Sequence, residues 1–368
     1  MSRRLQSSRS GRTRIARALA SICFAAAVSA AGIAAAEDGL FVSKQFTPVK
    51  EYTSGIEGPA VNAAGDLFVT NIRRVGTPNP DRKGVIGVLR KGAAKSTVFA
   101  VLPSRVTSDG TTVRGIGNGI RFDQQGRMYV ADYPNHIIHM FEPNSTTRRD
   151  YFVALPNNPG KPAFNQPNDL AIARDGTLYA SDPDMTAGTG QIWQITRGSD
   201  GLGRGKPMTS TRSMGKTNGI DLSPDNKTLY VSESSFGGEH PKRPSSVWAY
   251  RIDGAALADP VPVKTFTDGF DVDGLRVDTD GRIFVARPEA RQVVILVPPG
   301  SVGAPHDDPV KTTGQNPNNL TFGGADGRDV YVTQGDADKR YVERFRTDRP
   351  GREPCLQTPA PAGCTPVP

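Results

Sequence analysis

One sequence unit recurs six times along this chain of 368 residues, and the recurrence limits the folds that the chain is able to adopt. Each unit begins with a polar residue, usually followed by glycine, and continues through an alternating apolar strand and a turn into a second strand that opens with an aromatic residue. The polar residue precedes the aromatic by 11 or 12 positions in every copy. We call the leading polar residues the heads: Glu57, Asn118, Asn168, Asn218, Asp273 and Asn319. Such regular spacing identifies a repeat protein.

The segments between the units have room for two further strands, as in residues 136–143 and 246–253. A four-stranded repeat of roughly 40 to 60 residues is typical of a β-propeller blade. We therefore predict an all-β fold, a six-bladed β-propeller of four-stranded antiparallel blades, over residues 37–349. Residues 40–52 are expected to supply the outer strand that closes the ring and covers the sheet edges. A pair of sandwich domains is the alternative, but it does not explain a polar residue at every head.

The first 36 residues are typical of a signal peptide. They contain six arginines and no acidic residue, and an apolar run from Ala18 to Ala36 ends in a small-residue cleavage site. We expect an exported protein, periplasmic or secreted, that is free of the membrane after cleavage. An uncleaved anchor is the alternative, because the run approaches the ~20 residues of a span. Without this segment the chain has 39 basic and 37 acidic side chains, so most of the formal charge of +8 belongs to the signal peptide. The remaining chain is nearly neutral, and we expect no nucleic acid as a partner.

Residues 350–368 form a Pro-rich tail that contains Cys355 and Cys364. In an oxidising compartment these two cysteines are expected to form a local disulfide. We expect the tail itself to be a mobile appendage that takes no part in chemistry.

The chemical nature of the heads predicts a metal site. In a propeller the head of each innermost strand points toward the central channel, and all six heads are oxygen donors. A ring of carboxylates and amides without His or Cys suits Ca²⁺, which takes six to eight oxygen ligands, and another divalent cation fits the same donors. Asn and Asp-Gly also begin strands for local reasons, but that explanation weakens with each further copy.

In this order and spacing the motifs resemble the SMP-30/gluconolactonase/regucalcin-like lactonases over about residues 50–335. The motifs are Glu57-Gly58-Pro59, Pro167-Asn168-Asp169, Asn218-Gly219-Ile220, Asp273-Gly274-Leu275 and Asn319-Leu320-Thr321-Phe322-Gly323-Gly324. The resemblance implies a six-bladed propeller with one divalent cation in the channel. Its implied ligands are Glu57, Asn168, Asn218 and Asp273, with Asp273 also the general base. The other two heads, Asn118 and Asn319, are expected to contact the substrate.

This donor set agrees with hydrolysis. A lactone carbonyl needs a Lewis acid that stabilises the developing oxyanion, and a carboxylate that accepts a proton from the attacking water. We therefore expect a lactonase or esterase of the gluconolactonase type that acts on a small sugar lactone or related ester. The alternative is a non-catalytic propeller that keeps calcium for stability and binds a ligand or a protein partner.

Two positions that differ from the gluconolactonase pattern, together with three long loops, predict the rim that contacts the substrate. Asp132-Tyr133 stands where gluconolactonases often have Glu-His, and Asp182-Pro183 is followed by Asp184-Met185 instead of Tyr-Gly. We expect these residues at the rim, in contact with sugar hydroxyls. Three long polar connections, residues 73–84, 102–115 and 234–245, are expected to form the substrate entrance.

Overall fold

A computed structural model describes the chain over residues 39–156, 158–234, 244–336 and 338–364. It divides into two units, Met1–Leu40 and Phe41–Pro368, and the second contains every strand of the described residues. The predicted signal peptide lies outside the described residues. Within the described part, no helix has the length and apolar character needed to span a membrane.

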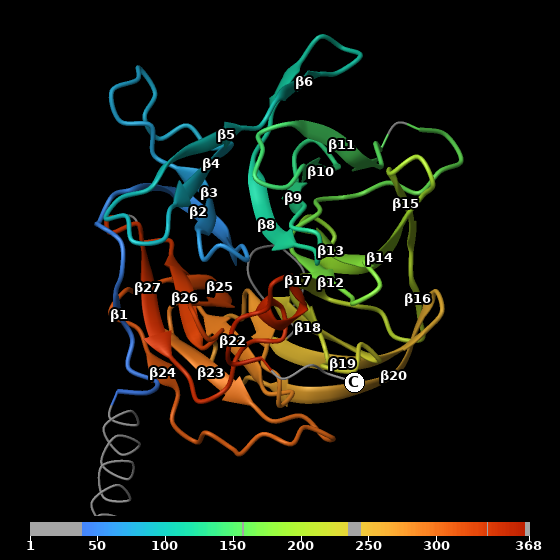
Figure 1. The fold of residues 1–368 in the computed structure, drawn as a ribbon. Helices are drawn as coiled ribbons and strands as arrows, with labels where there is room; N and C mark the ends of the chain where they lie inside the picture. Colours follow the sequence, from blue (N-terminus) through green and yellow to red (C-terminus); the bar gives the residue numbers. More distant parts are fainter. Residues whose placement is uncertain (1–38, 157, 235–243, 337, 365–368) are drawn as a thin grey trace, which may run out of the picture. The chain divides into compact units, whose positions relative to one another are not determined.

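The second unit is a six-bladed β-propeller, as predicted. Its six sheets follow one another around a centre (Figure 1), and the innermost strands of neighbouring blades contact each other. Blade 1 contains β2 (Tyr52–Val61), β3 (Leu67–Ile72), β4 (Val85–Leu89) and β5 (Thr97–Val101). Blade 2 contains β8 (Gly117–Phe122), β9 (Met128–Asp132), β10 (Ile137–Phe141) and β11 (Arg148–Val153). Blade 3 contains β12 (Leu170–Ile172), β13 (Leu178–Asp184), β14 (Thr189–Arg197) and β15 (Gly203–Pro207).

Of the remaining blades, blade 4 has an added strand and blade 6 closes the ring. Blade 4 contains β17 (Lys216–Leu222), β18 (Thr228–Ser234), β19 (Ser246–Asp253) and β20 (Ala256–Thr265), with β16 (Thr209–Ser210) added in parallel. Blade 5 contains β21 (Leu275–Val277), β22 (Ile283–Arg287), β23 (Gln292–Leu296) and β24 (Val310–Lys311). Blade 6 contains β25 (Pro317–Gly323), β26 (Asp329–Gln334), β27 (Tyr341–Arg346) and β1 (Lys44–Gln45). A separate hairpin of β6 (Ser104–Val106) and β7 (Thr112–Arg114) lies between blades 1 and 2 in the chain.

The hydrophobic core consists of clusters at the junctions between neighbouring blades. The aromatic residue of each repeat lies in the cluster that its blade shares with the next one. Phe68 of blade 1 packs edge-on against Phe122 of blade 2, with ring centroids 5.2 Å apart, and Tyr331 of blade 6 shares a cluster with Tyr52 of blade 1. The constant spacing between head and aromatic therefore has a structural cause. One strand pair must reach the axis with its head and fill the space between blades with its aromatic ring.

The N-terminal strand closes the ring, as predicted for residues 40–52. β1 pairs antiparallel with β27 and places Lys44 opposite Arg344. Just beyond the strand, the Thr47 N–H donates to the Val342 carbonyl at 3.1 Å, and Thr47 Oγ1 accepts the Val342 N–H at 2.9 Å. The first and last strands of the propeller thus belong to one blade.

The C-terminal tail is not the mobile appendage that its composition predicted. Its described part, residues 350–364, docks across the ends of the strands opposite the heads and contains the 3-10 helix η1 (Pro354–Leu356). Its partners in blades 1 to 6 are, in order, Val61, Arg121, Ile172, Asp221, Val277 and Gly327. Cys355 and Cys364 form a disulfide, with their Cα atoms 5.3 Å apart. The prediction was wrong because these partners come from distant parts of the sequence, which local composition does not report.

Candidate functional site

Five of the six predicted heads lie at one end of the ring. Glu57, Asn118 and Asn218 belong to the innermost strands β2, β8 and β17, and Asn168 and Asp273 stand just before β12 and β21. Each of the five is partly exposed, although the residues on both sides of it are buried. Solvent therefore reaches these side chains from the channel mouth.

The glycine that follows most heads has a steric cause. The Gly119 N–H donates to the Asn168 carbonyl of the next blade at 2.9 Å, and the Gly219 N–H donates to the Asp273 carbonyl at 3.3 Å. A Cβ atom on Gly219 would stand 2.6 Å from that same Asp273 oxygen. The innermost strands therefore approach too closely for a side chain at this position. Backbone hydrogen bonds link one head to the next instead.

In the sixth blade the structure places Asn318, not Asn319, in the position of a head. The Gly274 N–H donates to the Asn318 carbonyl at 2.8 Å, which matches the links between the other blades. The hairpin between the head and the aromatic residue is two residues longer in blade 6 than in blade 5. A search for a nearly constant spacing therefore identified the wrong asparagine. Asn319 lies one layer deeper. It is 1% exposed, and its Nδ2 donates to Glu57 Oε2 at 3.0 Å.

Glu57 and Asp273 bring two carboxylates into mutual repulsion. Burial raises the pKa of Glu57 from 4.5 to about 7, although a hydrogen bond from Asn319 and the charge of Arg121 lower it. Burial also raises the pKa of Asp273, and the charge of Glu57 raises it further, against a hydrogen bond from Asn218. A cation bound between these two carboxylates would relieve both effects, since an opposite charge favours the ionised form.

The side chains at this end fit a divalent cation that prefers oxygen. Beside the two carboxylates stand the amides of Asn168 and Asn218, and the buried Oδ1 of Asn118 has no hydrogen-bond partner among the described residues. Flexible, all-oxygen coordination is what Ca²⁺ accepts. In the part of the chain that the structure describes, no three His, Cys, Asp or Glu side chains form a metal cluster. Any site here must therefore use asparagine oxygens.

A second polar position recurs in the repeats, and the sequence analysis missed it. It stands three residues after the aromatic and is buried in every blade; the residues are Asn71, Asp132, Asp182, Glu233, Arg287 and Gln334. Asp182 accepts the Gln166 N–H at 2.7 Å, and Glu233 accepts the Gly215 N–H at 2.9 Å. These bonds fix the backbone two or three residues before a head. The spacing argument that identified the heads would also have identified this second set.

The same burial corrects the prediction that Asp132 and Asp182 line the rim. Both side chains are 0% exposed. Asp132 accepts the Ile116 N–H at 3.1 Å and lies 3.0 Å from His139 Nε2, so it holds the loop that enters blade 2. The exposed or partly exposed members of the two motifs are Tyr133, Asp184 and Met185.

The two predicted entrance loops that the structure describes lie on the same side of the ring as the heads. Innermost strands begin at the heads, and each antiparallel neighbour returns to that end. Residues 73–84 follow β3 at its returning end, and residues 102–115 lead into β8 and include the β6–β7 hairpin. Most of the third predicted loop, residues 234–245, lies outside the described residues. The described loops are therefore placed where an entrance would be needed.

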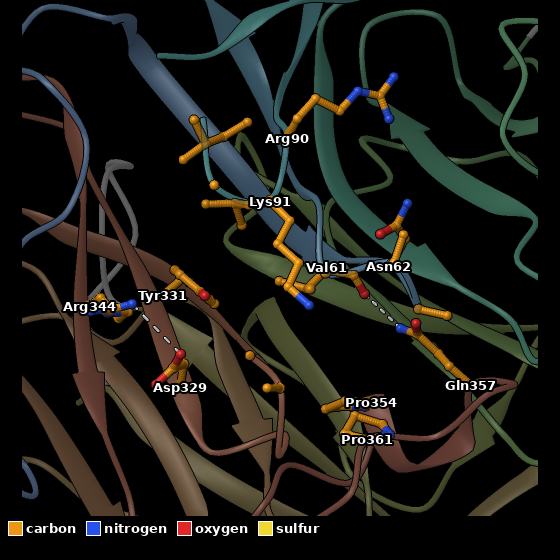
Figure 2. Close-up of a pocket in the computed structure, with 18 of the residues that line it drawn as sticks. Val61, Asn62, Arg90, Lys91, Asp329, Tyr331, Arg344, Pro354, Gln357 and Pro361 are labelled. Carbon is orange, nitrogen blue, oxygen red and sulfur yellow. Dashed lines mark hydrogen bonds and ion pairs between the residues drawn. The ribbon is translucent and has the colours of Figure 1, made fainter. Parts of the chain in front are cut away.

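A cavity of about 530 Å³ lies elsewhere, between blades 1 and 6 and the C-terminal tail (Figure 2). Lys91 and Tyr331 contribute to its lining, and the Gln357 side chain bonds the Val61 carbonyl in its wall at 2.7 Å. No head lines this cavity. It is therefore separate from the site formed by the heads.

Comparison with known proteins agrees with the fold and with the family resemblance. A family model described as the SMP-30/gluconolactonase/LRE-like region matches residues 119–336. A gluconolactonase from Zymomonas mobilis subsp. mobilis strain ZM4 is 28% identical over 244 residues, which make up 62% of this chain and 63% of that protein. The match thus covers less than two thirds of the relative's length.

Solved structures share the architecture. A gluconolactonase from Xanthomonas campestris is 19% identical, with a TM-score of 0.55 and coverage of 84% of this chain and 89% of that one. Regucalcin from Agrobacterium tumefaciens strain C58, a calcium-binding protein, is 15% identical, with a TM-score of 0.56 and coverage of 83% and 98%. At these identities the likeness establishes the fold alone.

Proposed function

Because the chain belongs to the SMP-30/gluconolactonase/LRE-like family, we propose that it is a divalent-metal-dependent hydrolase that opens a sugar lactone or a related ester. The name of the Zymomonas mobilis relative, gluconolactonase, supports a lactone as substrate. The observation that carries the proposal is the pair Glu57 and Asp273. These carboxylates share the solvent-reached end of the axis with asparagine amides, and burial and mutual repulsion raise the pKa of Asp273.

Four side chains are assigned to the cation: Glu57, Asn168, Asn218 and Asp273. Ca²⁺ is the ion we expect, because the donors are all oxygen and because regucalcin, which shares the fold, is described as calcium-binding. A bound divalent cation would polarise a lactone carbonyl and lower the pKa of a water molecule.

Asp273 is the residue that moves the proton. Its carboxylate, which Asn218 orients by a hydrogen bond, accepts a proton from the attacking water. The water oxygen bonds to the carbonyl carbon, the ring C–O bond breaks, and the proton passes to the ring oxygen. One lactone and one water thus give one hydroxy acid. Asn118 is assigned to the substrate, because its Oδ1 has no hydrogen-bond partner among the described residues and would accept a hydrogen bond from a substrate hydroxyl.

The location is part of the proposal. Residues 1–36 would direct export, and the Cys355–Cys364 disulfide supports a compartment outside the cytoplasm, where such bonds persist.

A pH-stat assay of lactones and aryl esters tests the activity, because hydrolysis of either substrate releases a carboxylic acid. We expect turnover that chelation abolishes and added calcium restores. Asp273→Asn keeps the size and one oxygen donor but removes the basicity, so turnover should fall by roughly 10² to 10⁴. Calorimetry on the same preparation should show that calcium still binds, more weakly.

Asp253→Asn is the matched control, since this carboxylate lies on the surface with its side chain 66% exposed. It should leave both turnover and calcium binding unchanged. Wild-type turnover in an Asp273→Asn protein that binds calcium would exclude Asp273 as the base. If the intact, calcium-loaded protein hydrolyses no lactone or ester, a binding propeller is the better account.

A further inference from the structure

Beneath the heads, a layer of buried ionic side chains crosses the channel. Arg121 and Arg276 stand three residues after the heads of blades 2 and 5, on opposite sides of the ring, and both reach Asp169 of blade 3. The distances are 2.8 Å from Arg121 to Asp169 Oδ1 and 2.8 Å from Arg276 to Asp169 Oδ2. All three side chains are at most 1% exposed. We call this group the floor of the site.

The floor makes contact with one predicted metal ligand through a single amide. Arg276 donates to Asn319 Oδ1 at 3.2 Å, and the Leu320 N–H donates to the same oxygen at 2.8 Å. Because these two donors hold Oδ1 on the Arg276 side, the Asn319 amide directs its Nδ2 toward Glu57. Nδ2 donates to Glu57 Oε2 at 3.0 Å. The Gly58 N–H donates to Oε2 as well, at 3.1 Å. The orientation of the Glu57 carboxylate is therefore fixed from below.

The C-terminal tail completes the floor from the opposite end of the channel. Glu353 lies 3.4 Å from Arg121, and Arg352 donates to Asp221 at 2.6 Å. The three arginines of the floor and tail thus face three carboxylates: Arg121, Arg276 and Arg352 against Asp169, Asp221 and Glu353. Each of these arginines therefore has a carboxylate partner below the heads.

We propose that Arg276 and Asn319 are positioning residues, which hold Glu57 in the orientation that a divalent cation requires. This inference rests on the proposed function in one respect, namely that Glu57 is a ligand of the cation. Partners that orient a metal ligand without touching the metal commonly change its affinity by 10- to 100-fold, roughly. The same range is expected here.

Calorimetric titration of the full mature chain with CaCl₂ tests the proposal without any substrate. Arg276→Met and Asn319→Leu should each weaken calcium binding by roughly 10- to 100-fold. Arg276→Lys keeps the charge beside Asp169 and should weaken it less than Arg276→Met. Because both residues act through one contact, the double variant should bind no worse than the weaker-binding single variant.

Arg352→Met is the matched control, because it removes an equally buried arginine that bonds Asp221 and the Ile172 carbonyl instead of Asn319. It should lower the melting temperature and leave the calcium affinity within about twofold of wild type. Folded Arg276→Met and Asn319→Leu proteins with wild-type affinity would overturn the inference, and so would an Arg352→Met protein that loses affinity equally. A wild-type protein that binds no calcium would instead refute the metal dependence in the proposed function.

Discussion

Among single residues, the glycines after the heads show how closely the innermost strands meet. Gly219 has the Leu275 nitrogen, the Asp273 oxygen and backbone of Gly274 where a Cβ would be. These are backbone atoms, so they are unable to move aside as the end of a long side chain would. The head-glycine pairs in the sequence are therefore a packing requirement at the axis as much as a feature of the site.

Gly219→Ala should destabilise the protein by about 1–3 kcal/mol, the usual cost of overfilling a packed interior. It should also weaken calcium binding, because the new methyl group pushes against Asp273. Equilibrium unfolding in urea and calorimetry measure the two effects. Gly198→Ala is the control, since its Cβ would meet first the flexible side chain of Asp200. Equal losses in the two variants would contradict the steric argument.

Two histidines in blade 2, the buried His139 and the partly exposed His136, have pKa values shifted in opposite directions. Burial lowers the pKa of His139, but hydrogen bonds to Asp132 and Asp150 outweigh it and raise the pKa above 6.5 overall, against the opposing charge of Arg148. Burial lowers the pKa of His136 below 6.5. A raised histidine pKa stabilises the fold below pH 6.5, and that contribution disappears as pH rises through the folded-state pKa. A lowered histidine pKa stabilises the fold above pH 6.5, and that contribution disappears as pH falls through the folded-state pKa.

The unfolding free energy lost in His139→Gln should therefore be larger at pH 5.5 than at pH 9. For His136→Gln, the loss should be larger at pH 9. Urea unfolding of the wild type and both variants at the two pH values measures these differences. If the loss of unfolding free energy changes with pH in the same direction for both substitutions, the pKa shift of at least one histidine is wrong.

Among the elements, β1 is a strand of only two residues, yet it joins the two ends of the ring. Its pairing with β27 is short, and side chains on either side of it add to the hold. Ser43 Oγ donates to Glu343 Oε2 at 2.6 Å, and Thr47, 1% exposed, accepts the Val342 N–H. Closure thus depends on side-chain hydrogen bonds as well as on the strand ladder.

Thr47→Val keeps the shape of the side chain but leaves the buried Val342 N–H without its acceptor. We expect a loss of about 1–3 kcal/mol in the free energy of unfolding. Thr47→Ser retains the hydroxyl and should lose clearly less. Urea denaturation compares the two variants directly, and an equal loss in both would mean that packing, not the hydrogen bond, secures the closure.

For the whole molecule, the sequence predicted what each repeat encodes locally. The heads and aromatics revealed six blades because each strand pair must reach both the axis and the next blade. The assignment of Asn319 as a head failed where a longer hairpin changed the spacing. The docked tail could not be predicted, because Arg352 finds Ile172 and Asp221 only after the ring has formed. Burial of Asp132 likewise depends on His139 of the neighbouring strand.

The shared blade also determines when the molecule is able to form during its own synthesis. Thr47 and Val342 are separated by 295 residues, and Ser43 and Glu343 by 300. A ribosome therefore releases β1 early, and that strand has no partner until nearly the whole polypeptide has emerged. Chains cut short by premature termination lack β27 and leave the ring open, with strand edges that invite association. Closure of the ring therefore waits for synthesis to pass Arg346, the last residue of β27.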